Sequence, residues 1–197
     1  SRSSPGRDLG SIRMNIRLLE TDAERERVYR LVHEEYVKQK YITPRDDGRF
    51  VHYCGIFDRI PQTDVFLAFD GEELIGTNSL TRDNEVGLHT CVDFPKETMR
   101  ERLTGKSLAS SWRIVTREDC RAASGLVSSL IRATVHRMKA LGVETTLFTF
   151  HPKHMCRYHL ALGMEMIGFS EKTEGLNSAP AVLMRAYTRE YPERWFR

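Results

Sequence analysis

The sequence predicts an α/β fold of the mixed, α+β kind, in which helices flank a sheet with both parallel and antiparallel strands. Three observations support this prediction. A β-hairpin is expected at 65–80, because Asp70 and Gly71 separate two apolar runs and supply the positive φ angles of a tight turn. A strand at 112–116 is followed by an amphipathic helix at 126–141, and strands and helices then alternate. Such an order indicates a mixed sheet.

The first half of the chain is predicted to contain a long helix before the hairpin. Thr21 and Glu24 form a capping-box pattern, and apolar residues then recur at helical spacing to about residue 40. Residues 41–62 mix Pro, Asp, Gly and aromatic residues without a clear period, so either a loop or a short second helix fits. A short helix is expected at 94–103, with Pro95 in its first turn.

The second half is predicted to complete the sheet. Residues 144–150 have the composition of a strand, and residues 152–162 that of a helix that starts at a proline and ends before Gly163. Two further strands are expected at 164–169 and 181–187, on either side of a loop rich in Gly, Asn, Ser and Pro.

The segment 110–142 is the part around which we expect the chain to be organised. The helix at 126–141 has one apolar face, and Gly142 ends it. The loop before it consists of small residues, and the free N–H groups and dipole of a helix N-terminus can hold a phosphate. The same residues would equally let the helix pack closely on a sheet. The segment from Arg113 to Lys139 contains six basic residues and only two acidic ones, which favours an acidic partner.

Composition favours one soluble domain. With 197 residues, 40% of them hydrophobic, the chain can bury a core, and we expect a flexible leader at 1–15 and a single domain at 16–197. The net charge of +3 without aromatic clustering disfavours a nucleic-acid partner. No apolar run is long enough to cross a bilayer. The four scattered cysteines are typical of free thiols in a reducing cytoplasm and indicate no metal site.

Several stretches together resemble a known enzyme family. They are Val28-Tyr-Arg-Leu-Val-His-Glu-Glu-Tyr-Val, Asp64-Val-Phe-Leu-Ala, Leu74-Ile-Gly-Thr-Asn-Ser-Leu, Gly105-Lys-Ser-Leu-Ala and His151-Pro-Lys-His. Their order and spacing are similar to those of the long-chain N-acyl amino acid synthases, which have the GNAT acyltransferase fold and are relatives of the acyl-homoserine lactone synthases. The resemblance covers about residues 16–186, and the chain looks like a synthase that acts on tyrosine.

The resemblance implies the substrates. A long-chain fatty acyl group would pass from a thioester on an acyl carrier protein to the α-amino group of an amino acid, most of all tyrosine, to give N-acyl tyrosine. The donor would be the acyl-phosphopantetheine of the carrier, and no cofactor would be bound covalently to the enzyme.

The resemblance also implies roles for individual residues. Tyr158 matches the tyrosine that lies near the departing sulfur in many members of the fold. The strand at 113–115 matches the one that pairs with the pantetheine arm and offers a backbone N–H to the thioester carbonyl, and the loop at 120–125 matches the phosphate-holding loop. The implied donor-binding residues are Arg113, Ile114, Val115, Arg121, Ala122, Ala123, Ser124 and Gly125.

Three features depart from the pattern of the relatives. Gly125 alone remains of the usual glycines in the phosphate loop, which implies that coenzyme A is held poorly while a carrier protein can supply contacts of its own. Ser110 stands where relatives carry a glutamate three residues before the arginine equivalent to Arg113, so the expected carboxylate base is absent there. Val32 and Tyr41 replace an arginine and a tryptophan of the homoserine lactone synthases, which argues for a different acceptor.

Amide formation from a thioester requires a base for the amine, a stabilised oxyanion and a proton for the departing thiolate. Tyr158 is the candidate proton donor, because the pKa of a phenol, roughly 10, lies close to that of a thiol, roughly 8.5. A half-buried structural tyrosine fits that position equally well. The candidate bases are Glu85 and His151, followed by His154 and Glu101, with Ser110 placed to position a water.

Binding groups are expected on the neighbouring strands and around the loop. A guanidinium matches the geometry of the acceptor's carboxylate, which favours Arg82 or Arg113, followed by Arg49. The acyl chain requires an apolar slot, and four aromatic residues are candidates for its lining, although such a stripe also fits a plain core. These residues are Phe66, Trp112, Phe148 and Phe150. Acyl carrier proteins are acidic, so carrier contacts are predicted at Arg117, Arg121, Arg132 and Lys153.

Two other functions remain open at this point. One is a coenzyme-A-dependent N-acetyltransferase, which the loss of loop glycines disfavours. The other is a non-catalytic binding protein that keeps the GNAT fold while Ser110 replaces the base.

Overall fold

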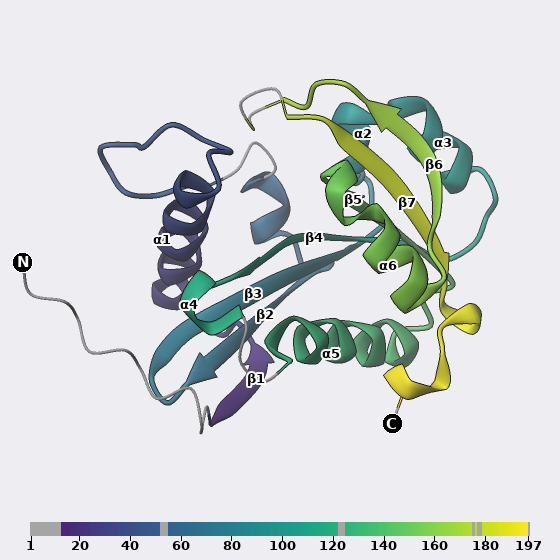
Figure 1. Cartoon of the computed structure of the whole chain (residues 1–197). Coiled ribbons are helices and arrows are strands. Elements are labelled where there is room, and N and C mark those ends of the chain that lie inside the picture. The colour runs from purple at the N-terminus through teal and green to yellow at the C-terminus, as the bar shows by residue number, and fades with distance from the viewer. Residues whose placement is uncertain (1–12, 52–54, 122–124, 175, 177–178, 197) are drawn as a thin grey trace, which may run out of the picture.

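A single seven-stranded sheet runs through the computed structural model, which describes residues 13–51, 55–121, 125–174, 176 and 179–196 (Figure 1). The strand order is β1-β2-β3-β4-β5-β7-β6. Strands β4 and β5 are parallel, and all other neighbouring pairs are antiparallel. The predicted mixed sheet is therefore confirmed.

The elements alternate along the chain much as the sequence predicts. The strands are β1 (Met14–Leu18), β2 (Thr63–Asp70), β3 (Glu73–Arg82), β4 (Leu108–Thr116), β5 (Thr145–Phe150), β6 (Glu165–Ser170) and β7 (Ala181–Tyr187). The α-helices are α1 (Asp22–Lys38), α2 (Thr90–Asp93), α3 (Pro95–Arg102), α4 (Glu118–Arg121), α5 (Leu126–Ala140) and α6 (Met155–Leu162). The described residues also contain the short 3-10 helices η1 (Gly55–Arg59), η2 (Pro152–His154), η3 (Thr188–Glu190) and η4 (Glu193–Trp195).

The differences from the prediction lie in short elements. Strand β1 was not predicted, and it takes in Met14 and Asn15, which the sequence assigned to the leader. Met14, Ile16 and Leu18 do alternate with Asn15 and Arg17, but this edge strand has only five residues, so the alternation is short and is easily taken for part of the leader. The one-turn helices α2 and α4 are too short to give a helical period. Strand β4 begins at Leu108, earlier than expected. The prediction missed this start because Ala109, Ser110 and Ser111 are small residues without the composition of a strand.

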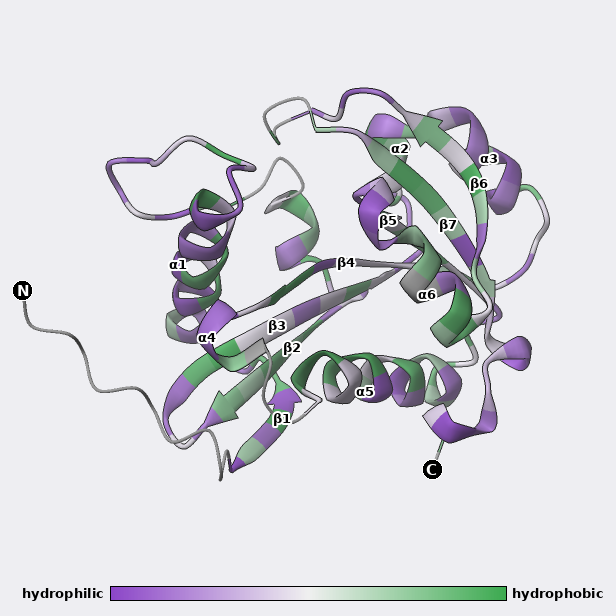
Figure 2. Ribbon diagram, in the orientation of Figure 1, coloured by the Kyte–Doolittle hydropathy of each residue, from purple (hydrophilic) through white to green (hydrophobic). Residues whose placement is uncertain are grey.

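Helices cover both faces of the sheet. Helix α1 starts at Thr21, whose hydroxyl accepts a hydrogen bond from the Glu24 N–H, and packs Val28 and Val32 against Leu67 of β2. Helix α5 packs on strands β2 and β3 with the apolar face that the sequence predicts. Figure 2 shows polar and apolar residues alternating along both helices. No helix among the described residues is long and apolar enough to cross a membrane.

The largest buried cluster joins the two halves of the sheet. It contains Phe66 and Ala68 from β2 together with Val182 and Met184 from β7, and Leu130 of α5 belongs to the same cluster. Helix α5 therefore packs against a core that both halves share, not against the N-terminal strands alone.

The sheet splits between its two parallel strands. Pairing of β4 with β5 runs from Leu108 opposite Thr145 to Ser111 opposite Phe148, where the printed register ends. On its other side β4 contains a bulge, because Thr77 pairs with Val115 whereas Ser79 pairs with Trp112. The bulge places Arg113 at a φ of 57°, a left-handed conformation that is uncommon outside glycine.

Candidate functional site

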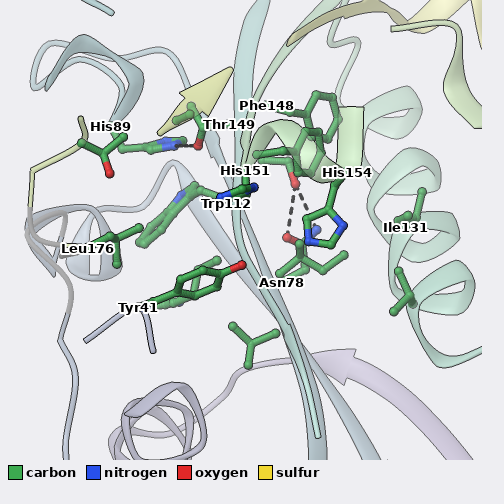
Figure 3. Close-up of a pocket in the computed structure, with 18 of the residues that line it drawn as sticks. Tyr41, Asn78, His89, Trp112, Ile131, Phe148, Thr149, His151, His154 and Leu176 are labelled. Carbon is green, nitrogen blue, oxygen red and sulfur yellow. Dashed lines mark hydrogen bonds between the residues drawn. The ribbon is translucent and has the colours of Figure 1, made fainter. Parts of the chain in front are cut away.

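A cavity of about 360 Å³ lies where β4 and β5 part (Figure 3). This volume is in the range of pockets that bind small molecules. Residues from α1, both parted strands, α5, η2 and the segment before β7 line it. Because β4 and β5 separate here, the two sides of the cavity are lined by residues of different chemical character.

One side of the cavity, which we call the apolar wall, is formed in large part by α5. It consists of Val127, Ile131, Val135, Met138, Phe148, Leu162 and Met164. Asn78 lies beside this wall, and its amide donates hydrogen bonds to Ser111 Oγ at 3.0 Å and to Thr134 Oγ1 at 2.8 Å. Because these hydroxyls satisfy the buried amide donors, the network ties α5 to strands β3 and β4.

The opposite side, which we call the polar wall, consists of Glu35, Tyr41, His89, Trp112 and Thr149. Figure 3 shows His89, Trp112 and Tyr41 across the strands from Phe148 and Ile131. The centre of the His89 ring lies 5.5 Å from that of Trp112, and the indole N–H donates to Thr81 Oγ1 at 3.0 Å. The cavity thus has an apolar side and a side rich in aromatic and hydrogen-bonding groups.

His89 is nearly inaccessible, with 3% of its surface exposed. Its Nδ1 lies 3.1 Å from Ser110 Oγ, and its Nε2 lies 3.3 Å from Thr149 Oγ1. Burial lowers the pKa of His89 to about 3, because the charged ring would lose its hydration. The imidazole is therefore neutral at ordinary pH.

This burial predicts a pH dependence of stability. A base whose pKa is lowered by folding contributes stability above its unfolded pKa of about 6.5, and that contribution is lost as the pH falls toward the folded value. Between pH 6.5 and pH 3, the free energy of unfolding should fall more steeply in the unmodified protein than in His89→Gln, by up to about 1.4 kcal/mol per pH unit. Urea denaturation at a series of pH values measures this difference, and equal slopes would contradict it.

A buried ion pair lies behind the polar wall. The guanidinium of Arg113 donates to both carboxylate oxygens of Asp58, at 2.8 and 2.6 Å, and to Ser79 Oγ at 2.8 Å. The Tyr29 hydroxyl donates to Asp58 at 3.0 Å. Burial, reinforced by the Asp58 charge, raises the pKa of Tyr29 to about 12. This pair occupies the guanidinium of Arg113, which therefore does not offer it to an acceptor's carboxylate.

The backbone at the bulge has a different environment. The register of the described strands gives Arg113 and Ile114 no partner on β3 or β5, and both residues line the cavity. The structure thus brings backbone groups of the strand 113–115 to the cavity, whereas the Arg113 side chain turns away into its ion pair.

Several predicted site residues meet at the cavity. Trp112, Phe148 and Phe150 line it, and the rings of Phe148 and Phe150 are stacked at 5.8 Å. His151 also lines it and stacks on Tyr41 at 6.5 Å. Burial, with a smaller effect of the Lys153 charge, lowers the pKa of His151. Lys153 and His154 complete the predicted residues at the cavity wall.

Other predicted residues lie elsewhere. Glu85 is exposed in the turn after β3, and Phe66 belongs to the core under α5. Arg82 is half-buried at the end of β3 and does not line the cavity. Glu101 pairs with Arg185 at 2.8 Å. Arg49 is likewise paired, with Glu26 at 2.6 Å, so none of these side chains reaches the cavity.

The loop before α5 is only partly described. Ala122, Ala123 and Ser124 lie outside the described residues, as do the side chains of Arg121 and Tyr158. Gly125 precedes α5 with a φ of 66°, which suits glycine.

The side chains predicted to contact the carrier differ in their ion pairing and exposure. Arg117 pairs with Asp119 at 2.7 Å and with Glu73, so two carboxylates already balance its charge. Arg132 is exposed on α5, and the Lys153 ammonium lies 5.5 Å from the centre of the Tyr41 ring.

Sequence reasoning missed three residues that shape the site, His89, Thr149 and Asp58. Each is isolated in the sequence, and only the pairing of β4 with β5 and the position of α2 bring the first two together. Among the described residues, no group of three or more His, Cys, Asp or Glu side chains is placed to hold a metal ion.

Comparisons with known proteins agree with this architecture. A family model described as N-acyl amino acid synthase FeeM matches residues 27–187. The structure of FeeM, an N-acyl amino acid synthase from uncultured soil microbes, is similar with a TM-score of 0.77 and 26% identity, over 90% of this chain and 92% of that one. No curated protein matches this chain.

More distant structures share the fold. BjaI, a CoA-dependent acyl-homoserine lactone synthase solved with SAM and isopentyl-CoA, gives a TM-score of 0.64 at 18% identity, over 85% of this chain and 77% of that one. A GNAT-family acetyltransferase from Streptococcus pneumoniae gives 0.59 at 16%, over 88% and 98%. The predicted GNAT acyltransferase fold is therefore confirmed. Since the family model spans most of its length, the chain belongs to the FeeM family of N-acyl amino acid synthases and is an N-acyltransferase.

Proposed function

We propose that this enzyme transfers a long-chain acyl group from the phosphopantetheine thioester of an acyl carrier protein to the α-amino group of an amino acid, with tyrosine as the first candidate. The observation that carries this proposal is the two-sided cavity between β4 and β5. It offers an apolar wall to a fatty chain and a polar, aromatic wall to an amino acid.

The apolar wall supports a long acyl chain. Ile131, Val135 and Met138 from α5 form this wall together with Phe148 of β5, and these side chains carry no hydrogen-bonding group for a small polar donor. Burying one methylene stabilises a complex by about 0.8 kcal/mol, so a long chain gains far more from this wall than an acetyl group does.

The bulge of β4 supports a role in stabilising the oxyanion. The thioester carbonyl develops negative charge as the amine attacks, and a fixed backbone N–H directed at it lowers the barrier. The register of the described strands gives Arg113 and Ile114 no partner, and the backbone of these two residues lies at the cavity. The ion pair with Asp58 holds the bulge in place from behind.

The polar wall supports an aromatic acceptor. Tyr41, Trp112 and His151 present rings to the cavity, and aromatic rings associate favourably in stacked or edge-to-face arrangements. A tyrosine side chain could pack among them with its amino group directed toward the parted strands.

A product assay tests the proposal. The purified protein is mixed with each amino acid in turn and either palmitoyl carrier protein or acetyl-coenzyme A, and the products are identified by mass spectrometry. Long-chain N-acyl tyrosine formed only with the carrier is the expected result. Acetylated product would instead identify a coenzyme-A-dependent N-acetyltransferase, and a preference for another amino acid would replace tyrosine as the acceptor.

The carrier contact makes a separate prediction. Arg121→Glu combined with Arg132→Glu should raise the KM for palmitoyl carrier protein about tenfold with little change in kcat, since rim charges mainly steer association. The effect should shrink with added salt, because screening weakens contacts between exposed charges.

A matched control is Arg100→Glu, which reverses an exposed charge on α3, outside the cavity lining. It should leave the KM unchanged. Unaltered carrier-dependent activity in the double variant would show that the carrier docks elsewhere.

A further inference from the structure

The two basic side chains of the cavity lining, leaving histidines aside, differ in how their charges are balanced. Among the described residues, the arginine and lysine that line the cavity are Arg113 and Lys153. The Arg113 guanidinium is held by Asp58 in the interior. Lys153 is exposed at the cavity wall, and its ammonium forms no ion pair with a carboxylate in the part of the chain that the structure describes. Lys153 therefore presents an unbalanced positive charge at the cavity.

Two aromatic side chains surround the Lys153 ammonium on the cavity side. The ammonium lies 5.5 Å from the centre of the Tyr41 ring, and that ring stacks on His151 at 6.5 Å. Tyr41 and His151 both line the cavity (Figure 3). The face of an aromatic ring attracts a cation without neutralising its charge. The contact with Tyr41 therefore positions the ammonium and leaves its charge available to a ligand.

We propose that Lys153 binds the α-carboxylate of the acceptor amino acid. This inference deepens the proposed function and rests on it, because it names the residue by which the enzyme distinguishes an amino acid from a simple amine. An ammonium forms a charge-assisted hydrogen bond with a carboxylate, which is stronger than a bond between neutral groups. The proposal gives Lys153 the role for which the sequence favoured Arg82, Arg113 or Arg49.

His151 provides a neutral donor beside this charge. Its Nδ1 accepts a hydrogen bond from the Lys153 backbone N–H at 3.2 Å, which leaves the proton of the neutral ring on Nε2. Burial, with a smaller effect of the Lys153 charge, lowers the pKa of His151, so the ring is neutral at neutral pH. The Nε2–H can donate a hydrogen bond to a carboxylate, while the attractive charge comes from Lys153.

The carboxylates of the cavity lining have donors of their own. Glu35 accepts hydrogen bonds from Lys38 Nζ at 2.8 Å and from the Glu118 N–H at 3.1 Å. Asp93 accepts one from the Glu174 N–H at 3.1 Å. Because these groups do not balance Lys153, an arriving carboxylate displaces no internal partner from the ammonium and gains its attraction in full.

The sequence also predicted a carrier contact at Lys153, and the two roles have different kinetic effects. A carrier contact would change the KM for palmitoyl carrier protein, because rim charges mainly steer association. A carboxylate contact changes the KM for the amino acid and leaves the KM for the carrier as it is. Its effect also disappears when the acceptor lacks the carboxylate.

Two acceptors that differ only in the carboxylate test the inference. Lys153→Gln should raise the KM for tyrosine about tenfold, because it removes a hydrogen bond between charged groups. The KM for tyramine, which is tyrosine without its carboxylate, should not rise. If tyramine is not acylated, its inhibition constant against tyrosine gives the same comparison. Lys153→Arg, which keeps the positive charge, should restore most of the affinity for tyrosine. If the enzyme prefers another amino acid, that amino acid and its decarboxylated amine replace this pair.

A binding measurement gives a readout that needs no turnover. Hydroxyphenylpropanoate keeps the ring and the carboxylate of tyrosine but lacks the amine, so it binds without reacting. Isothermal titration calorimetry should give a Kd about tenfold higher in Lys153→Gln than in the unmodified enzyme. Lys106→Gln is the matched control, because the Lys106 ammonium also lies over a tyrosine ring, 4.6 Å from the centre of Tyr187, but does not line the cavity. It should leave this Kd and the KM values unchanged.

The outcomes are distinct. Equal rises in KM for tyrosine and tyramine, or an unchanged Kd for hydroxyphenylpropanoate in Lys153→Gln, would overturn the inference. A rise confined to the KM for the carrier would also overturn it and would support the predicted carrier contact. An unmodified enzyme that forms no acyl amide with any amino acid would overturn the proposed function itself, before any variant is compared.

Discussion

Replacing Asp58 with alanine is expected to lower the free energy of unfolding by about 3–5 kcal/mol. The side chains of Arg113 and Asp58 are 1% and 0% exposed, so the substitution leaves an uncompensated guanidinium in the interior. The Tyr29 hydroxyl and Ser79 remain near it, but neither carries a balancing charge. Urea denaturation of the two proteins at pH 7 measures the difference.

An exposed ion pair provides the control for this prediction. Asp22 lies 3.3 Å from Arg25 with 77% of its side chain exposed, and Asp22→Ala should change stability little, because water screens such pairs. Adding Arg113→Met to Asp58→Ala should recover much of the loss, since the double variant no longer buries a charge. A loss below about 1 kcal/mol in Asp58→Ala would mean that water reaches the guanidinium.

Replacing Tyr158 with phenylalanine is expected to slow turnover about 100-fold without raising the KM for either substrate. The residue lies in α6, between His154 and Leu162, which both line the cavity. If its hydroxyl protonates the departing thiolate, removal of that single oxygen slows the chemical step but leaves binding intact. Steady-state kinetics with palmitoyl carrier protein and tyrosine measure both constants.

Tyr187→Phe is the matched control for Tyr158→Phe. Tyr187 ends β7, packs against Lys106 and Arg185, and does not line the cavity, so its substitution should leave kcat unchanged. An unaltered turnover in Tyr158→Phe would remove this residue from the mechanism. Equal losses in the two variants would point to a general effect on packing.

The fold was predictable because its main signals are local. The capping box at Thr21 and Glu24, the Asp70-Gly71 turn and the apolar face of α5 each lie within a few residues of one another, and each appears in the structure. The elements that were missed give only short signals. Strand β1 is a short edge strand, and its position is set by pairing with β2, whose sequence lies far along the chain.

The site was less predictable because it depends on contacts between distant segments. Trp112, Phe148 and Phe150 were found, since strands with aromatic residues flank the predicted loop. Arg113 lines the cavity, but its buried partner Asp58 lies 55 residues away, and no pattern indicated the pair. His89 is separated from Ser110 by 21 residues and from Thr149 by 60, so only the folded sheet shows the three together.

The core that joins the halves of the sheet has a consequence for motion. Strands β4 and β5 separate, but the two halves of the sheet are not separate domains. One buried cluster contains Phe66 from β2 as well as Val182 from β7. A hinge movement of one half against the other would have to break that cluster, which is far more costly than rotating side chains. The cleft is therefore held open before substrates arrive, and little of the binding free energy is spent on shaping it.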